Sequence, residues 1–98
     1  MQRFQHYIDG EFSDGEASYP SIDPASGAVW AEMPEAREGD VDRAVNAADR
    51  ALYEGPWPKM TATQRGKLLY KLADLVAANA QVLAELETRD TGKIIRET

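Results

Sequence analysis

The spacing of apolar residues changes near residue 38. Before this point, apolar residues come in short segments separated by turn-forming residues, a pattern typical of strands. After it, they recur every three or four positions, as they do on one face of an amphipathic helix. We therefore predict strands and turns over residues 1–36 and helices over residues 37–98.

Two turn signals divide the first part of the chain. Asp9-Gly10 lies between the apolar-bearing pairs Tyr7-Ile8 and Glu11-Phe12, which predicts a hairpin because both central residues of a type I′ turn favour positive φ. The segment 23–27 contains Pro24 and Gly27, and it predicts a second reversal of the chain.

The second reversal separates two further predicted strands, at 19–22 and 28–33. Between the hairpin and these strands, residues 13–18 are rich in turn-forming and acidic residues, which favours a solvated loop. The first third of the chain is thus expected to form a small antiparallel sheet.

The first predicted helix runs from Glu38 to about Tyr53 and is stopped by the proline pair in 55–58. Acidic residues in its first turn suit the helix dipole. Arg37 precedes it, where Ser, Thr or Asp would form a better N-cap, so we expect a less firm start.

Two more helical stretches follow. Thr61 and Gln64 have the spacing of a capping box, and Asn79 is expected to end or kink the helix by adopting a left-handed conformation. The last stretch closes near Asp90, with Gly92 just past its end. The apolar stripes are interpreted as core-packing faces. They comprise Leu68, Leu69, Leu72, Leu75, Val76, Val82, Leu83 and Leu86.

Composition indicates a soluble domain. Hydrophobic residues make up 43% of the chain and charged residues 29%, with no apolar run long enough for a membrane span. The N-terminus has no secretory signal pattern, so we expect a cytoplasmic location. The net charge of −6 disfavours a nucleic-acid partner. Lys59, Arg65, Lys67 and Lys71 are therefore interpreted as a solvated helix face.

No motif in the chain assigns a reaction. There is no cysteine, and no glycine-rich loop has the spacing that cradles a phosphate. The acidic residues of 9–16 do not follow the EF-hand order. His6 is the only histidine, and no nucleophile-elbow pattern surrounds Ser13, Ser18, Ser21 or Ser26, so we predict no catalytic residue.

The order of several short motifs nevertheless resembles the opening of the NAD(P)-dependent aldehyde dehydrogenase family. The motifs span nearly the whole chain in register. They are Tyr7-Ile8-Asp9-Gly10-Glu11-Phe12, Ser21-Ile22-Asp23-Pro24-Ala25-Ser26-Gly27, Ala31-Glu32-Met33-Pro34-Glu35-Ala36, Asp40-Val41-Asp42-Arg43-Ala44-Val45 with Ala47-Ala48, then Trp57, Arg65, Leu72-Ala73-Asp74-Leu75 and Leu86-Glu87-Thr88-Arg89-Asp90-Thr91-Gly92-Lys93.

The resemblance implies an α+β fragment of the α/β aldehyde dehydrogenase fold, with short antiparallel strands followed by two or three amphipathic helices. It places residues 1–98 in the cofactor and oligomerisation region. The family oxidises aldehydes to acids with NAD or NADP, using a cysteine nucleophile and a glutamate that lie outside the region matched here. The chain alone is therefore expected to be inactive and to bind no cofactor.

Three further expectations follow from the resemblance. Several family members hold a structural cation near positions matching Ile22 and Asp90, which implies a partial metal site here. The chain stops within a new pattern after Lys93, which suggests truncation. Exposed apolar helix faces would then drive homo-oligomer formation. The alternative is a stand-alone protein-interaction module of the same ancestry.

Overall fold

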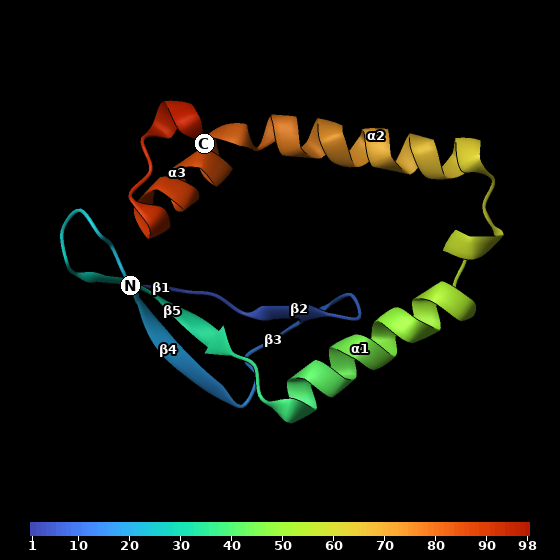
Figure 1. The fold of residues 1–98 in the computed structure, drawn as a ribbon, viewed down its shortest axis with the longest axis horizontal. Helices are drawn as coiled ribbons and strands as arrows, with labels where there is room; N and C mark the ends of the chain where they lie inside the picture. Colours follow the sequence, from blue (N-terminus) through green and yellow to red (C-terminus); the bar gives the residue numbers. More distant parts are fainter.

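In the computed structural model, which describes residues 1–98, all strands precede all helices (Figure 1). The last strand ends at Glu35 and the first α-helix begins at Glu38. The elements are β1 (Gln2–Arg3), β2 (His6–Ile8), β3 (Glu11–Ser13), β4 (Ala17–Ile22), β5 (Val29–Glu35), α1 (Glu38–Tyr53), the 3₁₀ turn η1 (Trp57–Lys59), α2 (Ala62–Ala78), α3 (Ala80–Thr91) and the 3₁₀ turn η2 (Ile95–Glu97).

The strands form one three-stranded sheet, in the order β1-β5-β4, and one hairpin of β2 with β3. β4 pairs antiparallel to β5, but β1 pairs parallel to it, so the larger sheet is mixed rather than antiparallel. The sequence gives no sign of β1, because this strand has only two residues and both are polar.

The predicted hairpin is confirmed. Asp9 and Gly10 have φ values of 54° and 76°, as a type I′ turn requires, and Tyr7 pairs with Phe12 across it. The predicted loop over residues 13–18 is wrong at both ends, since Ser13 belongs to β3 and Ala17 begins β4. Pairing of Ala17 with Glu35 extends the sheet into a segment whose composition favours a loop.

The bounds predicted for the first helix are confirmed, and Arg37 is its N-cap. The guanidinium group carries no acceptor, so Arg37 cannot cap the helix with its side chain. The Asp40 carboxylate compensates from inside the first turn, because it accepts a hydrogen bond from the Arg37 backbone N–H at 3.2 Å. The first turn of α1 is therefore more stable than expected from the lack of a capping side chain at Arg37.

The capping box of the second helix is confirmed, with Thr61 and Gln64 exchanging hydrogen bonds of 3.2 and 2.9 Å. The left-handed conformation predicted for Asn79 is wrong, because its φ is −110° and its ψ is 16°. Its side-chain amide instead donates to the Leu75 carbonyl, and α3 begins one residue later. Gly92 ends α3 with a φ of 78°, as predicted.

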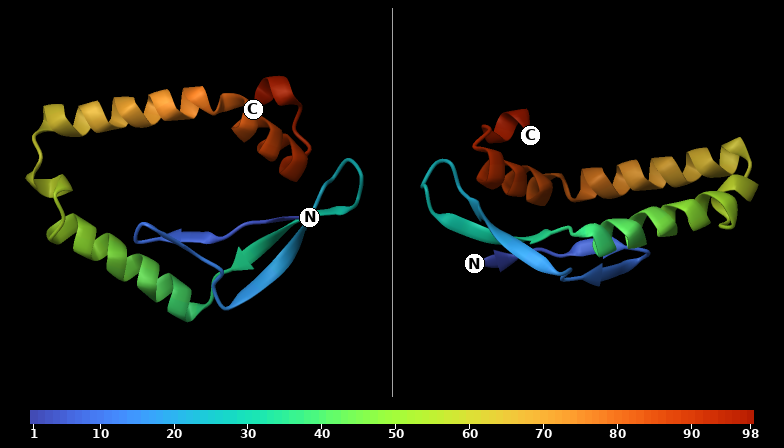
Figure 2. Two further views of the ribbon diagram at one scale, coloured as in Figure 1. Left: turned by 180° about the vertical axis from the view of Figure 1, so that it is seen from behind. Right: turned by 60° about the horizontal axis from the view of Figure 1, so that its bottom comes forward.

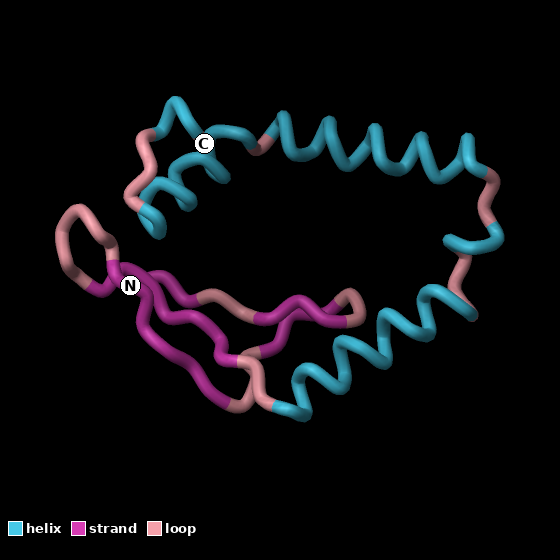
Figure 3. The backbone as a smooth tube through the Cα atoms, viewed as in Figure 1, coloured by secondary structure: helices cyan, strands magenta, loops and turns pink.

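The backbone traces an open ring, with α2 on the far side from the strands (Figures 1 and 3). The molecule measures 48 × 35 × 15 Å and is therefore thin along its shortest axis; Figure 2 shows it from behind and tilted by 60°. Its radius of gyration of 16.9 Å exceeds the roughly 13 Å of a compact chain of this length. The chain is therefore open rather than compact.

Almost nothing is buried. Ala31 is the only buried hydrophobic residue, and Asp40 is the only buried polar one. The interpretation of the helical stripes as a packed core is therefore wrong for this chain. Residues such as Leu72 and Leu75 are 57% and 54% exposed, because α2 has no extensive contact with any other element.

Candidate functional site

Two side-chain clusters, and an exposed ion pair of Arg50 with Asp9 at 3.2 Å, connect the strands to the helices. No backbone hydrogen bond joins the two halves. One cluster surrounds Asp40 at the start of α1, and the other surrounds Asp90 near the end of α3. These clusters are where residues distant in sequence meet, so they are the candidates for a functional site.

The Asp40 carboxylate is 1% exposed and accepts hydrogen bonds from three residues. Its Oδ2 atom accepts from the backbone N–H groups of Arg37 and, at 3.4 Å, Glu16. Its Oδ1 atom accepts from the Arg43 guanidinium at 2.5 Å. Asp40 thus ties the loop before β4 to the first turn of α1.

These contacts lower the pKa of Asp40 below its ordinary value of 3.8. The hydrogen bond from the Arg37 backbone N–H is the largest cause. Burial acts in the opposite direction, and the Glu16 N–H, the Arg43 guanidinium and His6 add to the lowering. Asp40 is therefore an ionised anchor and is unsuited to act as a proton donor near neutral pH.

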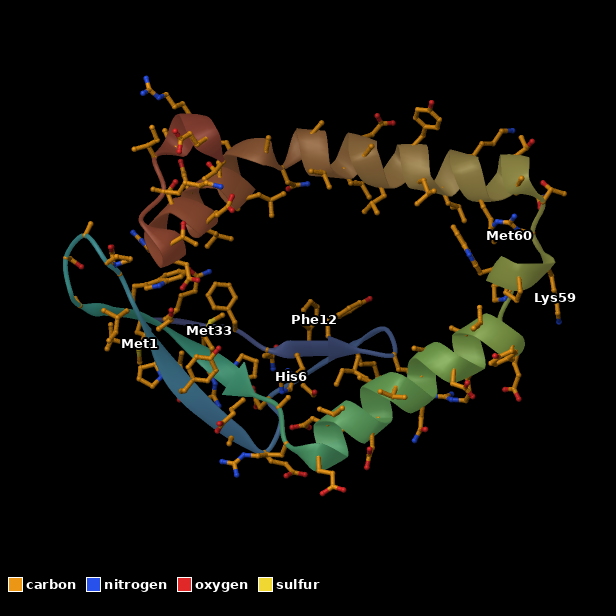
Figure 4. The ribbon with its side chains drawn as sticks, in the orientation of Figure 1. Met1, His6, Phe12, Met33, Lys59 and Met60 are labelled. Atoms are coloured by element: carbon orange, nitrogen blue, oxygen red, sulfur yellow. The ribbon has the colours of Figure 1, made fainter.

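His6 lies beside this anchor, between the hairpin and the start of α1 (Figure 4). Its Nε2 atom is 3.8 Å from Asp40 Oδ2 and is buried without a hydrogen-bond partner. Ser13 lies opposite His6 in the hairpin register, and its hydroxyl also has no partner. No hydrogen bond joins the three side chains, so they do not form a catalytic triad.

The second cluster holds α3 against the sheet through Asp90. The Asp90 Oδ1 atom accepts from the Ser21 hydroxyl at 2.5 Å and from the Trp30 indole N–H at 3.3 Å. The Arg89 guanidinium lies 5.7 Å from the centre of the Trp30 ring, in cation–π geometry. Phe4 contacts the same ring edge-on at 5.7 Å between centroids.

The structure places the two predicted cation ligands close to each other in the fold. Ile22 ends β4, and its neighbour Ser21 is bonded to Asp90. However, Asp90 is the only carboxylate in the cluster, one of its oxygens already accepts two hydrogen bonds, and no group of three metal-binding side chains exists. A hard cation prefers six or more oxygen ligands, so these residues do not form a cation site by themselves.

Sequence reasoning missed the partners of both aspartates. Asp40 is separated by 24 residues from Glu16, and Asp90 by 60 residues from Trp30. Periodicity reports contacts along one helix and not pairings of this range. The one local signal was at Arg37, since a helix whose N-cap lacks an acceptor favours an acidic residue at the third helical position.

Comparison with known proteins identifies the class. The model of the aldehyde dehydrogenase family matches residues 12–98. The whole chain is 63% identical to a fifth (20%) of (Z)-2-((N-methylformamido)methylene)-5-hydroxybutyrolactone dehydrogenase of Acinetobacter baylyi. Rat mitochondrial aldehyde dehydrogenase is 42% identical over 92 residues, which are 91% of this chain and 18% of that protein.

Solved structures agree. An NAD-dependent aldehyde dehydrogenase of Sinorhizobium meliloti matches 98% of this chain with a TM-score of 0.92 and 36% identity. The NAD⁺ complex of a Bacillus cereus aldehyde dehydrogenase matches 97% with the same TM-score of 0.92 and 39% identity. In each case the match covers 20% of the solved chain.

The chain therefore belongs to the aldehyde dehydrogenase family, as the sequence resemblance indicated. It corresponds to the N-terminal portion of its relatives and spans about a fifth of their length. The fold expected from the resemblance, short strands followed by two or three helices, is confirmed, and the chain has three. No helix is both long and apolar enough to cross a membrane.

Proposed function

We propose that this chain is the N-terminal part of an oxidoreductase that oxidises aldehydes to carboxylic acids with NAD or NADP. The observation that carries the proposal is the match of the whole chain to aldehyde dehydrogenases in both sequence and backbone. In this proposal, residues 1–98 belong to the cofactor and oligomerisation region of a cytoplasmic enzyme. Nothing in the comparisons supports the alternative of a stand-alone interaction module.

The role proposed for the chain itself is structural. It has no cysteine to act as the nucleophile, and its one histidine packs beside Asp40 rather than in an open cleft. Its exposed apolar helix faces suit packing against other parts of an enzyme. The chain would thus supply a scaffold, while the reacting groups come from elsewhere.

The proposal is tested by a chimera. The matched segment of the Bacillus cereus enzyme is replaced by this chain, and reduction of NAD is followed with simple aldehydes and with a 5-hydroxybutyrolactone. We expect the chimera to be active, the same enzyme without the segment to be inactive, and the 98-residue chain alone to show no turnover. A folded but inactive chimera, or turnover by the chain alone, would contradict the proposal.

We infer further that the cation site of Ile22 and Asp90 is only half supplied by this chain. The Ile22 carbonyl and the Asp90 carboxylate are the right ligand types for a hard cation. Two ligands are too few for a hard cation, and no third acidic, histidine or cysteine side chain lies beside them. The remaining oxygen ligands would come from outside these residues.

The chain is also proposed to self-associate through α2. It exposes 7610 Å² of surface, whereas a compact monomer of its mass of 10.8 kDa exposes about 5,500 Å². The excess of roughly 2,000 Å² is as large as a standard protein–protein interface. Leu68, Leu72 and Leu75 lie on one stripe of α2 and are about half exposed, as is Leu83 on α3. For the chain on its own, a second copy presents the same apolar stripe and is the proposed partner.

Light scattering after size-exclusion chromatography measures this association. We expect the chain to elute as a dimer or larger species, and the triple change of Leu68, Leu72 and Leu75 to Gln to shift it to the monomer. Gln is a good helix former, so α2 persists. Changing Lys67, Lys71 and Asp74 of the same helix to Gln serves as the control and leaves the association intact. A wild-type chain that is monomeric and binds no apolar dye would refute the proposed self-association.

A further inference from the structure

Trp30 is the extra residue of a β-bulge in the larger sheet. In the pairing of β4 with β5, Ser21 lies opposite Ala31. The next residue of β4, Ile22, lies opposite Val29, so Trp30 has no partner in β4. A regular ladder would pair Trp30 with Ile22 and turn its side chain to the face of the sheet away from Ser21, because neighbouring residues of a strand point to opposite faces. A bulge re-aims the side chain of the extra residue, here the Trp30 indole.

The re-aimed indole meets the Asp90 carboxylate of α3. Its N–H donates to Asp90 Oδ1 at 3.3 Å, and the Ser21 hydroxyl donates to the same oxygen. No hydrogen bond or ion pair from another residue of this chain reaches Oδ2. Asp90 therefore has one oxygen held by two donors from the sheet and one oxygen left for a further ligand.

The Trp30 ring is braced on two sides, which keeps its indole N–H directed at Asp90. Phe4 contacts the ring edge-on, with 69° between the two planes, and the Phe4 backbone N–H donates to the Glu32 carbonyl at 2.9 Å. Arg89 lies over the ring in cation–π geometry. Each of these contacts joins two residues of this chain, so further chain packed against them would cover the contacts without removing them.

We propose that Trp30 is a positioning residue for the half site of Ile22 and Asp90. Together with the Ser21 hydroxyl, the indole N–H fixes Asp90 Oδ1 and leaves Oδ2 as the oxygen that binds a cation. The inference rests on the cation half site proposed above, and it adds two residues that do not touch the cation themselves. Trp30 belongs to none of the motifs that resemble the family, and only the bulge and its hydrogen bond single it out.

Nuclear magnetic resonance tests the contact of Trp30 with Asp90 in the absence of a cation. The chain has two tryptophans, so its ¹⁵N-labelled form gives two indole N–H signals, which Trp57→Phe assigns. We expect the Trp30 indole N–H to exchange with water about tenfold more slowly in the parent than in Asp90→Ala, because a hydrogen bond to a charged group contributes on that order. The Trp57 signal is the internal control and should exchange equally in both. Equal exchange rates of the Trp30 signal in the two chains would overturn the proposal.

Cation binding is tested in the chimera described above, which supplies the parts of an enzyme outside this chain. Its melting temperature is measured against NaCl, KCl or MgCl₂, with tetramethylammonium chloride holding the ionic strength constant. We expect at least one of these salts to raise the melting temperature. In Trp30→Phe the half-saturating concentration of that salt should rise roughly 10–100-fold, as is typical when a hydrogen-bond partner of a metal ligand is lost. Phe keeps an aromatic ring between Phe4 and Arg89 and removes the N–H donor.

Matched changes separate positioning from a general loss of stability. Ser21→Thr keeps the hydroxyl and should keep the half-saturating concentration of the parent, whereas Ser21→Ala should raise it. Trp57→Phe changes the other tryptophan and should leave it unchanged. Equal half-saturating concentrations in Trp30→Phe and the parent, or no stabilisation of an active chimera by any of the three salts, would overturn the proposal. An inactive chimera would instead count against the proposed function, and the exchange of the Trp30 indole N–H would still decide whether Trp30 holds Asp90.

Discussion

Replacing Asp40 with alanine is expected to lower the melting temperature of the chain by roughly 10 °C. The change leaves the backbone N–H groups of Arg37 and Glu16 without their charged acceptor, in part-buried hydrogen bonds beside a side chain that is 1% exposed. Hydrogen bonds to a charged group are stronger than neutral ones, and the first turn of α1 loses its cap. Thermal unfolding followed by circular dichroism measures the effect.

Asp42→Ala is the matched control, because Asp42 is an exposed carboxylate of the same helix with no partner, and we expect little change in melting temperature there.

The pH dependence of stability gives a second check, through the Asp40→Asn variant. Since folding lowers the pKa of Asp40 from 3.8, its ionised form stabilises the fold above about pH 4, and that stability is lost as the pH falls through the lowered pKa. The difference in melting temperature between the parent chain and the Asp40→Asn variant should therefore narrow below pH 4. A difference in melting temperature that stays constant down to pH 2 would argue against a stabilising role of the ionised Asp40 carboxylate.

The sequence predicts what local rules determine. The type I′ turn at Asp9-Gly10, the capping box at Thr61 and the end of α3 at Gly92 each follow from the conformational preferences of the residues on the spot. Asn79 shows the limit of such rules: it tolerates the left-handed region, but here its side chain bonds to the Leu75 carbonyl and the chain stays near the helical region.

The sequence does not reveal whether an apolar stripe finds a partner. The stripe of α2 is amphipathic by periodicity, and periodicity alone favours burial, yet burial depends on what lies opposite. In this chain α2 faces an open ring. The resemblance to aldehyde dehydrogenases supplied the missing reasoning, since it led us to expect exposed apolar helix faces. Leu68, Leu72, Leu75 and Leu83 are exposed as that reasoning expects.

The Asp40 and Asp90 clusters show the same limit for polar residues. The sequence indicates that Asp40 lies in the first turn of a helix and Asp90 in the last turn of another, and the structure agrees. What makes each one important is a partner from the strands, and those partners are ordinary loop and strand residues with no motif of their own. Only the folded backbone brings Glu16 to Asp40 and Ser21 to Asp90.

Gly15→Ala is the second change with a large expected effect, because it strains the backbone and the Asp40 cluster together. Gly15 has a φ of 72°, which costs a residue with a side chain about 1–2 kcal/mol. A Cβ atom there would lie 2.7 Å from His6 Cδ2 and 3.2 Å from Asp40 Oδ2. The His6 ring is 15% exposed, and the carboxylate is held by two backbone N–H groups, so neither moves freely. We expect a loss of about 3 kcal/mol in the free energy of unfolding, measured in urea.

Gly27→Ala separates the two causes. Gly27 has nearly the same φ, 73°, but a Cβ atom there meets nothing within 4 Å, so only the same conformational cost of about 1–2 kcal/mol is expected. The difference between the two variants is then the steric cost at His6 and Asp40. If His6 is the obstacle, His6→Ala must recover part of the loss in the Gly15→Ala background and show a coupling of about 1 kcal/mol in a double-mutant cycle. Equal losses of unfolding free energy in the Gly15→Ala and Gly27→Ala variants would mean that His6 and Asp40 move aside for the new methyl group at little cost. The close contacts around Gly15 would then not be rigid.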